Sequence, residues 1–288
     1  MSDQAWDTLS IQAVSAAGVV YFLALMAYSA QWAAKRGLVA GDESPRAEVF
    51  GRFAFLLTGV AGGVHLLALV ARGLAADPNR VPWGNMYEFT LTASFVAVLV
   101  TLVFFRRWDL GFLGPWVVGL VMVVLMADVI WLYEPVAPLT ESLSSPWLVI
   151  HVIAAITATG VFTVAGLVSI LYLLRSSGRM PSLPAAEVLD RLAYRLHAFA
   201  FPIWTFAVLI AGPIWAHQAW SRYWGWDPKE IWAFITWVVY AAYLHARATA
   251  GWKGRAAAIV ALIGLATLWF NFIGINFFFG GGSQHSYA

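Results

Sequence analysis

Eight long apolar stretches, separated by short polar connections, constrain this chain more than any other feature of its sequence. They cover roughly residues 11–34, 53–74, 88–105, 110–133, 147–174, 197–219, 230–247 and 256–278. A helix of about 20 largely apolar residues is long enough to cross a hydrocarbon core of about 30 Å. The sequence therefore predicts an all-α, polytopic integral membrane helix bundle with eight transmembrane helices.

The composition agrees with a membrane protein. Hydrophobic residues make up 61% of the chain and charged residues 11%, whereas a soluble domain is about 45–50% apolar. No connection is long enough for a soluble domain, so we expect a single membrane domain over residues 1–288. The first residues are acidic and lack the positive region of a cleaved signal peptide, so the first helix should stay in the mature protein.

The Lys and Arg residues predict the orientation. Most of the 17 bases lie in or near alternate connections, which the positive-inside rule assigns to the cytoplasm. Both termini then face outward, together with the segments 81–88, 134–146 and 220–230. The net charge of +2 is small and its bases are sorted to one face, which argues against a nucleic-acid-binding protein.

Aromatic residues gather in the segment Trp220–Asp227, W-S-R-Y-W-G-W-D, which we name the Trp loop. Trp and Tyr anchor helix ends at membrane interfaces, but anchoring needs only one or two rings. The cluster in one connecting loop therefore favours a flat apolar surface for a ligand. Asp227, Pro228 and Glu230 match a helix capping box, and the sequence leaves open whether Asp227 caps a helix alone or also serves the ligand.

Two histidines are predicted to lie on the same side of the membrane as the Trp loop. His151 is about 7–8 Å below the outer start of its helix, and His285 lies in the outer tail behind a glycine-rich hinge. Haem iron takes imidazole above and below its plane, and aromatic rings shield a porphyrin. The pair therefore points to a planar macrocycle with an axially bound metal.

The other four histidines are predicted to lie elsewhere in the bundle. His245 lies about 22 Å down its helix, near the cytoplasmic end, where it either snorkels to the interface or binds a ligand at a second, deeper site. His65 is intramembrane without an evident partner, and His217 could line the Trp loop. His197 is expected at the cytoplasmic interface, at the start of the sixth helix.

These motifs resemble those of a known family. The segment Trp220–Trp232 looks like the tryptophan-rich (WWD) signature of haem-handling membrane proteins, and most resembles the CcsA/ResC family of system II cytochrome c biogenesis, sometimes labelled CcsB. The resemblance continues, in the family's order, through Pro82–Phe89, Pro146–Val152, Tyr243–Arg247 and Gln284–Ala288. The family usually has glycine where this chain has Ser221.

The resemblance implies a haem-carrying function. Such proteins bind haem b, move it across the bacterial cytoplasmic membrane with a ResB-like partner, and present it to apocytochrome c as part of a cytochrome c haem lyase, or holocytochrome c synthase. The partner supplies a further transmembrane histidine, and the C-x-x-C-H motif of apocytochrome c supplies both thiols, which fits a chain with no cysteine. Carried over by position, the outer axial ligands are His151 and His285, the transmembrane ligand is His245, and the other haem-binding residues are Trp220, Trp224, Trp226 and Asp227.

Other functions remain open from the sequence. A b-type electron-transfer cytochrome would need histidine pairs on facing helices, whereas His65 and His245 are predicted at different depths. A solute transporter would favour broken helices and buried charge near the midplane, and apart from Asp128 the predicted spans are nearly free of such charge. A haem exporter that delivers haem to a chaperone is a related possibility.

Overall fold

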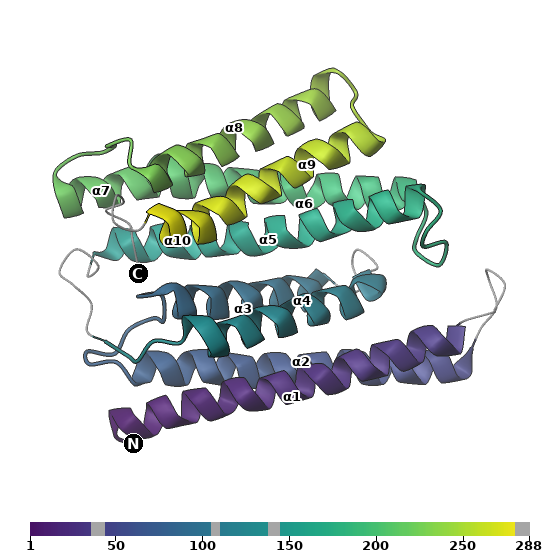
Figure 1. Cartoon of the computed structure of the whole chain (residues 1–288), viewed down its shortest axis with the longest axis horizontal. Coiled ribbons are helices and arrows are strands. Elements are labelled where there is room, and N and C mark those ends of the chain that lie inside the picture. Colours follow the sequence, from purple (N-terminus) through teal and green to yellow (C-terminus); the bar gives the residue numbers. More distant parts are fainter. Residues whose placement is uncertain (36–43, 105–109, 138–144, 280–288) are drawn as a thin grey trace. The chain divides into compact units, whose positions relative to one another are not determined.

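The structure is a computed structural model that describes residues 1–35, 44–104, 110–137 and 145–279. All regular elements within these ranges are helical (Figure 1). They group into two compact units, the first containing helices α1 to α4 and the second α5 to α10. The sequence-based expectation of a single domain over residues 1–288 stays a prediction.

Unit 1 contains four helical segments. Its elements are α1 (Asp3–Lys35), α2 (Pro45–Leu74), α3 (Met86–Phe104), and α4 (Gly114–Ala127), which extends from a 3-10 turn (Leu110–Leu113) to a π-helical turn (Asp128–Leu132). Ser44 caps α2, where its side chain accepts a hydrogen bond from the Ala47 backbone N–H and Pro45 occupies the first turn.

Helices α1 and α2 pack closely through small residues. Every seventh residue of α2 from Ala47 to Ala68 is a buried alanine, namely Ala47, Ala54, Ala61 and Ala68, and Ser10 of α1 donates to the Ala68 carbonyl at 2.9 Å. Small side chains let two membrane helices approach at short distance, and a seven-residue spacing keeps them on one helix face. Alanine periodicity therefore accounts for the pairing of the first two helices.

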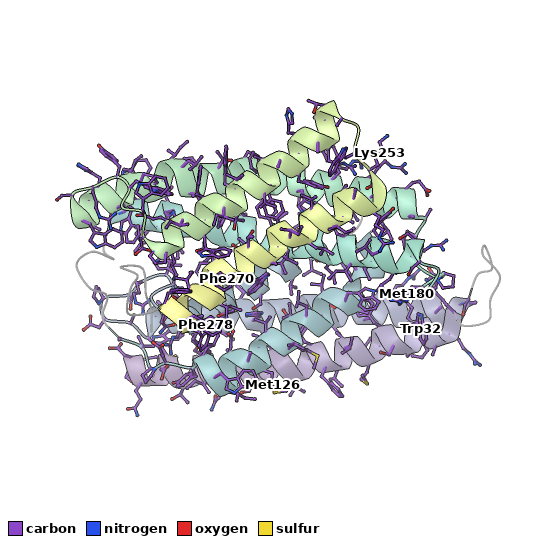
Figure 2. All side chains as sticks on the ribbon, turned by 45° about the horizontal axis from the view of Figure 1, so that its top comes forward. Trp32, Met126, Met180, Lys253, Phe270 and Phe278 are labelled. Atoms are coloured by element: carbon purple, nitrogen blue, oxygen red, sulfur yellow. The ribbon has the colours of Figure 1, made fainter. Side chains whose placement is uncertain are left out.

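Unit 2 is built from antiparallel helices (Figures 1 and 2). Its elements are α5 (Pro146–Ser176), α6 (Ala186–Phe206), α7 (Gly212–Trp220), α8 (Pro228–Thr249), α9 (Gly254–Trp269) and α10 (Ile275–Phe279). A π-helical turn, Ala207–Ala211, joins α6 to α7, and another, Phe270–Gly274, joins α9 to α10. Each pair therefore forms one continuous helical segment, and Figure 2 shows Phe270 and Phe278 along the second.

The predicted class of all-α membrane bundle is confirmed. The described residues form eight long helical segments, and seven are long and apolar enough to cross a membrane by length and composition. The remaining segment, α8, has too low a mean hydropathy, because Trp, Tyr and Thr residues interrupt its aliphatic sequence. The sixth segment begins at Ala186, eleven residues before the predicted start.

The expected interfacial position of His197 is wrong. Because α6 begins at Ala186, His197 lies three turns inside the helix, where it is fully buried. Its ring lies among Phe162, Tyr240 and Tyr243 at centroid distances of 5.9, 5.3 and 4.8 Å. Helices α5, α6 and α8 therefore meet at an aromatic core around this imidazole.

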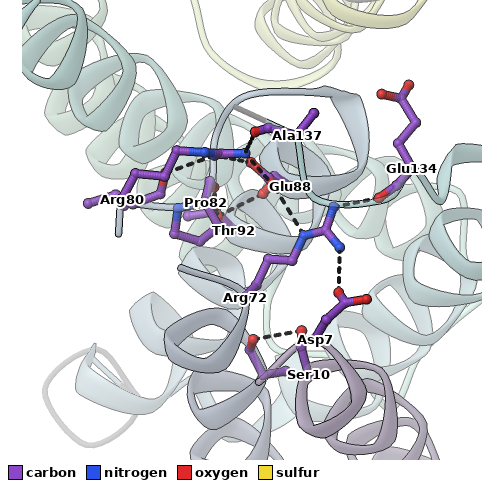
Figure 3. A network of polar contacts seen from close by, with 11 residues as sticks. Asp7, Ser10, Arg72, Arg80, Pro82, Glu88, Thr92, Glu134 and Ala137 are labelled. Atoms are coloured by element: carbon purple, nitrogen blue, oxygen red, sulfur yellow. Dashed lines mark hydrogen bonds and ion pairs between the residues drawn. The ribbon is translucent and has the colours of Figure 1, made fainter. Parts of the chain in front are cut away.

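A network of buried ion pairs and hydrogen bonds lies at the predicted outer end of unit 1 (Figure 3). The guanidinium of Arg72 donates to Glu88 of α3 and to Asp7 of α1, each at 3.0 Å, and also to the Glu134 backbone carbonyl. Arg80 donates to both oxygens of Glu88, at 2.6 and 3.1 Å. Glu88 belongs to the motif 82–89, so this network attaches the motif to helices α1 and α2.

Candidate functional site

His151 of α5 is held in one orientation by a backbone carbonyl of the neighbouring helix. Its Nδ1 lies 2.9 Å from the carbonyl oxygen of Ala207. Because a carbonyl can only accept, Nδ1 is the donor, and a neutral imidazole that donates from Nδ1 carries its lone pair on Nε2. Helix packing therefore selects the imidazole tautomer whose Nε2 can bind a metal.

The π-helical turn places this carbonyl where His151 can reach it. Ala207 begins the turn, and its carbonyl accepts from the backbone N–H of Gly212, five residues later. Pro213 follows in the first turn of α7, where its missing N–H and its ring disfavour a regular α-helical continuation. π-Helical turns inside longer helices are frequent at functional sites.

Gly212 leaves room for the His151 ring. A Cβ at this position would meet ring atoms of His151 and the Ala207 carbonyl oxygen, each at 3.1 Å. The imidazole also stacks on the buried Trp215 of α7, with ring centroids 5.9 Å apart and planes inclined by 14°. Trp215 in turn packs edge-on against Trp220, at 4.9 Å. Aromatic contacts therefore connect His151 to the first residue of the Trp loop.

The Trp loop is not one flat surface, so that part of the sequence-based expectation is wrong. Trp220 is the last residue of α7 rather than part of the connection. The rings of Trp224 and Trp226 meet edge to face, with centroids 5.8 Å apart and an angle of 83°. Edge-to-face contact is a preferred geometry for aromatic pairs. Trp226 is 66% exposed, whereas the buried indole Nε1 of Trp224 has no hydrogen-bond partner among the described residues.

Two non-glycine residues give the Trp loop its sharp turns. Ser221, directly after α7, and Trp226, directly before Asp227, both have φ of 56°. This left-handed region is uncommon for residues with a side chain and is favourable for glycine. A glycine at position 221, which the resemblance led us to expect, would adopt this conformation without a side-chain penalty.

Glu230 organises the end of the Trp loop. Its carboxylate accepts the backbone N–H groups of Gly225 and Asp227, at 2.7 and 3.1 Å, and lies 3.5 Å from the guanidinium of Arg222. Asp227 accepts the N–H of Lys229 at 2.9 Å, which confirms the predicted capping box. Asp227 thus has a capping function, and a role toward a ligand stays a prediction.

The structure positions the other predicted histidines differently. His217 stacks on Tyr223 of the Trp loop, at 4.3 Å and 17°, as the sequence suggested. His245 is exposed on α8, and His285 lies outside the described residues. His65 is buried in unit 1, where its ring nitrogens contact the Tyr21 hydroxyl and the Leu91 carbonyl, at 3.3 and 3.0 Å.

These features fit haem as a ligand of unit 2. The hydrogen bond from Nδ1 makes Nε2 the His151 nitrogen that carries the lone pair, and Gly212 lets the imidazole ring lie close to α7. The Trp224 indole offers a buried donor that no described residue satisfies, and Trp226 adds exposed aromatic surface. Ring stacking and axial imidazole coordination are the interactions that a metalloporphyrin requires.

The fold and the site define a polytopic membrane helix bundle with an aromatic and histidine-containing surface at one end of unit 2. The family described as cytochrome C assembly protein matches residues 83–281. This chain belongs to that family, as the sequence motifs predicted, and the membership places it in cytochrome c assembly.

Individual relatives agree with this assignment. The chain is 32% identical to the cytochrome c biogenesis protein CcsA of Synechococcus sp. (strain JA-2-3B'a(2-13)), over 81% of this chain and 84% of that protein. It is 30% identical to CcsA of Mesostigma viride, over 80% of this chain and 85% of that protein. The resemblance to the CcsA family is therefore confirmed.

A solved structure shares the fold. The chain resembles the cytochrome c haem lyase CcmF with a TM-score of 0.69 and 18% identity, over 94% of this chain. The aligned region is 47% of that protein, so this chain spans about half its length. At this identity the likeness concerns the fold alone.

Sequence reasoning missed several groups at the site. The roles of the Ala207 backbone carbonyl and of the missing Cβ at Gly212 cannot be recognised from the residue types in the sequence. Pro213 inside an apolar stretch was a usable signal, because it indicates an interrupted helix. Trp215 was interpreted only as part of an aromatic belt, although it lies five residues before the first residue of the Trp loop.

Proposed function

We propose that this chain binds haem b at the predicted outer end of unit 2 and presents it to apocytochrome c for covalent attachment, as a subunit of a cytochrome c haem lyase. The single observation that carries the proposal is the hydrogen bond from His151 Nδ1 to the Ala207 carbonyl. It orients an imidazole for axial coordination beside the Trp loop. Family membership supports the same function.

In this proposal, different residues of the chain have different roles in binding haem and in its attachment. His151 serves as one axial ligand and His285, from the tail, as the other. Trp220, Trp224 and Trp226 shield the porphyrin, and the capping box of Asp227 holds the end of the loop. The chain has no cysteine, so the thiols come from the C-x-x-C-H motif of apocytochrome c. Each S–H adds across a haem vinyl group, which forms one C–S bond and one C–H bond without a by-product.

The exposed His245 supports a second haem position that another chain completes. Its helix is held by Arg247, which pairs with Asp190 of α6 at 2.7 Å, while Asp190 also accepts the N–H of Gly254 at 3.0 Å. Tyr243, one turn before Arg247, is buried. Both contacts turn His245 toward the surface of unit 2, where a ResB-like partner in the bacterial cytoplasmic membrane can contribute the opposing ligand. Haem then moves from this position to the outer site.

Replacing Trp224 and Trp226 together by phenylalanine tests whether the Trp loop holds haem. Phenylalanine keeps most of the apolar area but loses the indole N–H and ring size, so we expect normal insertion with reduced haem content and reduced cytochrome c maturation. The measurement is the haem-to-protein ratio of the complex purified with a ResB-like subunit. Trp252→Phe is the matched control, because Trp252 is 45% exposed and follows the other end of α8. If the double variant kept its full haem content, the two tryptophans would have only the role of anchoring the helix ends at the membrane interface.

Gly212→Ala tests the orientation of His151 while keeping its imidazole. The added Cβ would press on the His151 ring and on the Ala207 carbonyl. Loss of a group that orients a metal ligand typically weakens binding by about 10–100-fold, so we expect a weakened low-spin haem spectrum at normal expression. Gly119→Ala is the control, because a Cβ there meets no atom within 4 Å. Equal spectra in both variants would contradict the proposed orientation.

A further inference from the structure

Asp128 is a carboxyl group in a predicted membrane span that haem binding leaves without a role. It begins the π-helical turn Asp128–Leu132 after α4, and it is fully buried. The Thr90 side chain of α3 is a hydrogen-bonding group that lies against the carboxyl, but no described donor reaches either carboxyl oxygen with ordinary hydrogen-bond distance and angle. Tyr87 is an electrostatic neighbour of both Asp128 and Arg72. An ionisable residue within a membrane is costly, and such residues commonly have a function.

The charged groups near Asp128 already balance one another. Arg72 pairs with Glu88 and Asp7, and Arg80 pairs with the second oxygen of Glu88. Two guanidinium groups thus face two carboxylates. All three side-chain nitrogens of Arg72 donate within this network, to Glu88, to Asp7 and to a backbone carbonyl. No hydrogen bond or ion pair among the described residues joins Asp128 to either guanidinium group, so an ionised Asp128 would be a buried negative charge without a bonded cation.

We infer that Asp128 is a proton-binding site, a neutral carboxylic acid inside unit 1. A metal cation would need several oxygen or nitrogen ligands, and the described residues contain no group of three or more histidine or acidic side chains that could hold one. A proton needs only one carboxyl oxygen. The bound proton also keeps Asp128 from competing with Glu88 for Arg72, so the ion network of unit 1 retains its pairing.

Infrared spectroscopy of the purified full-length protein tests this inference directly. A protonated carboxyl has a C=O stretching band that a carboxylate lacks. At neutral pH we expect this band in the wild-type protein, a shift after labelling with ¹³C-aspartate, and its complete loss in Asp128→Asn. The matched control is Asp190→Asn, which should keep the band, because Asp190 is ion-paired with Arg247.

The isotope label keeps the test decisive if Asp128→Asn does not fold, because it assigns the band to aspartate in the wild-type chain. Spectra in sodium, potassium and choline chloride distinguish a proton from a metal cation, and we expect the same band in all three. A wild-type spectrum without an aspartic acid band would overturn the inference. So would a band that appears only when sodium and potassium are replaced by choline, since a metal cation would then occupy the carboxyl.

Discussion

Replacing His151 by alanine should abolish the low-spin haem spectrum of the outer site. Two imidazoles on iron give sharp reduced α and β bands, and His151 is the imidazole whose tautomer is held by the Ala207 carbonyl. We expect these bands to fall by at least about tenfold and to return when free imidazole is added to the purified complex. Cytochrome c maturation should fall with them.

His217→Ala is the comparison for this experiment. His217 also lies beside the Trp loop, but it is exposed and stacks on Tyr223. We expect this variant to keep the low-spin bands. If His217→Ala lost the bands and His151→Ala kept them, the axial ligand would be His217 and not His151.

Replacing Glu88 by glutamine should strongly destabilise unit 1. Glu88 is fully buried and compensates two guanidinium groups, Arg72 and Arg80. Removing one partner of a buried ion pair leaves an uncompensated charge and costs about 3–5 kcal/mol. We therefore expect a large fall in the thermal unfolding midpoint of the protein in detergent, together with reduced accumulation in the membrane.

Glu48→Gln is the matched control for burial. Glu48 forms an ion pair with Arg52, one turn along α2, but their side chains are 64% and 76% exposed. Exposed pairs of this spacing contribute about 0.3–0.5 kcal/mol, so the unfolding midpoint should barely change. Equal effects of the two substitutions would show that burial does not govern the strength of the Glu88 network.

Local patterns were sufficient to predict several elements. The apolar stretches predicted the helical segments because a bilayer requires long apolar helices. The capping box at Asp227 and Glu230 was predictable because all its groups lie within four residues. The start of α6 was missed because its first turns, Ala186–Leu196, are amphipathic and charged rather than continuously apolar.

The side-chain environments were not predictable from such patterns. The sequence predicted His151 near the outer start of its helix, His197 at the cytoplasmic interface and His245 near a cytoplasmic helix end. The structure places His151 beside a backbone carbonyl, His197 inside an aromatic core, and His245 on an exposed helix face. These differences depend on contacts between helices that are far apart in sequence.

The sequence by itself determined that this chain is a helical membrane protein of the cytochrome c assembly family, because hydropathy and motif spacing are local properties. Only the tertiary structure decided which nitrogen of His151 donates, how the tryptophan rings meet, and which cations compensate Glu88. Each of these depends on the packing of one helix against another. The π-helical turn before Pro213 turns the Ala207 carbonyl toward α5, and that single contact orients the imidazole.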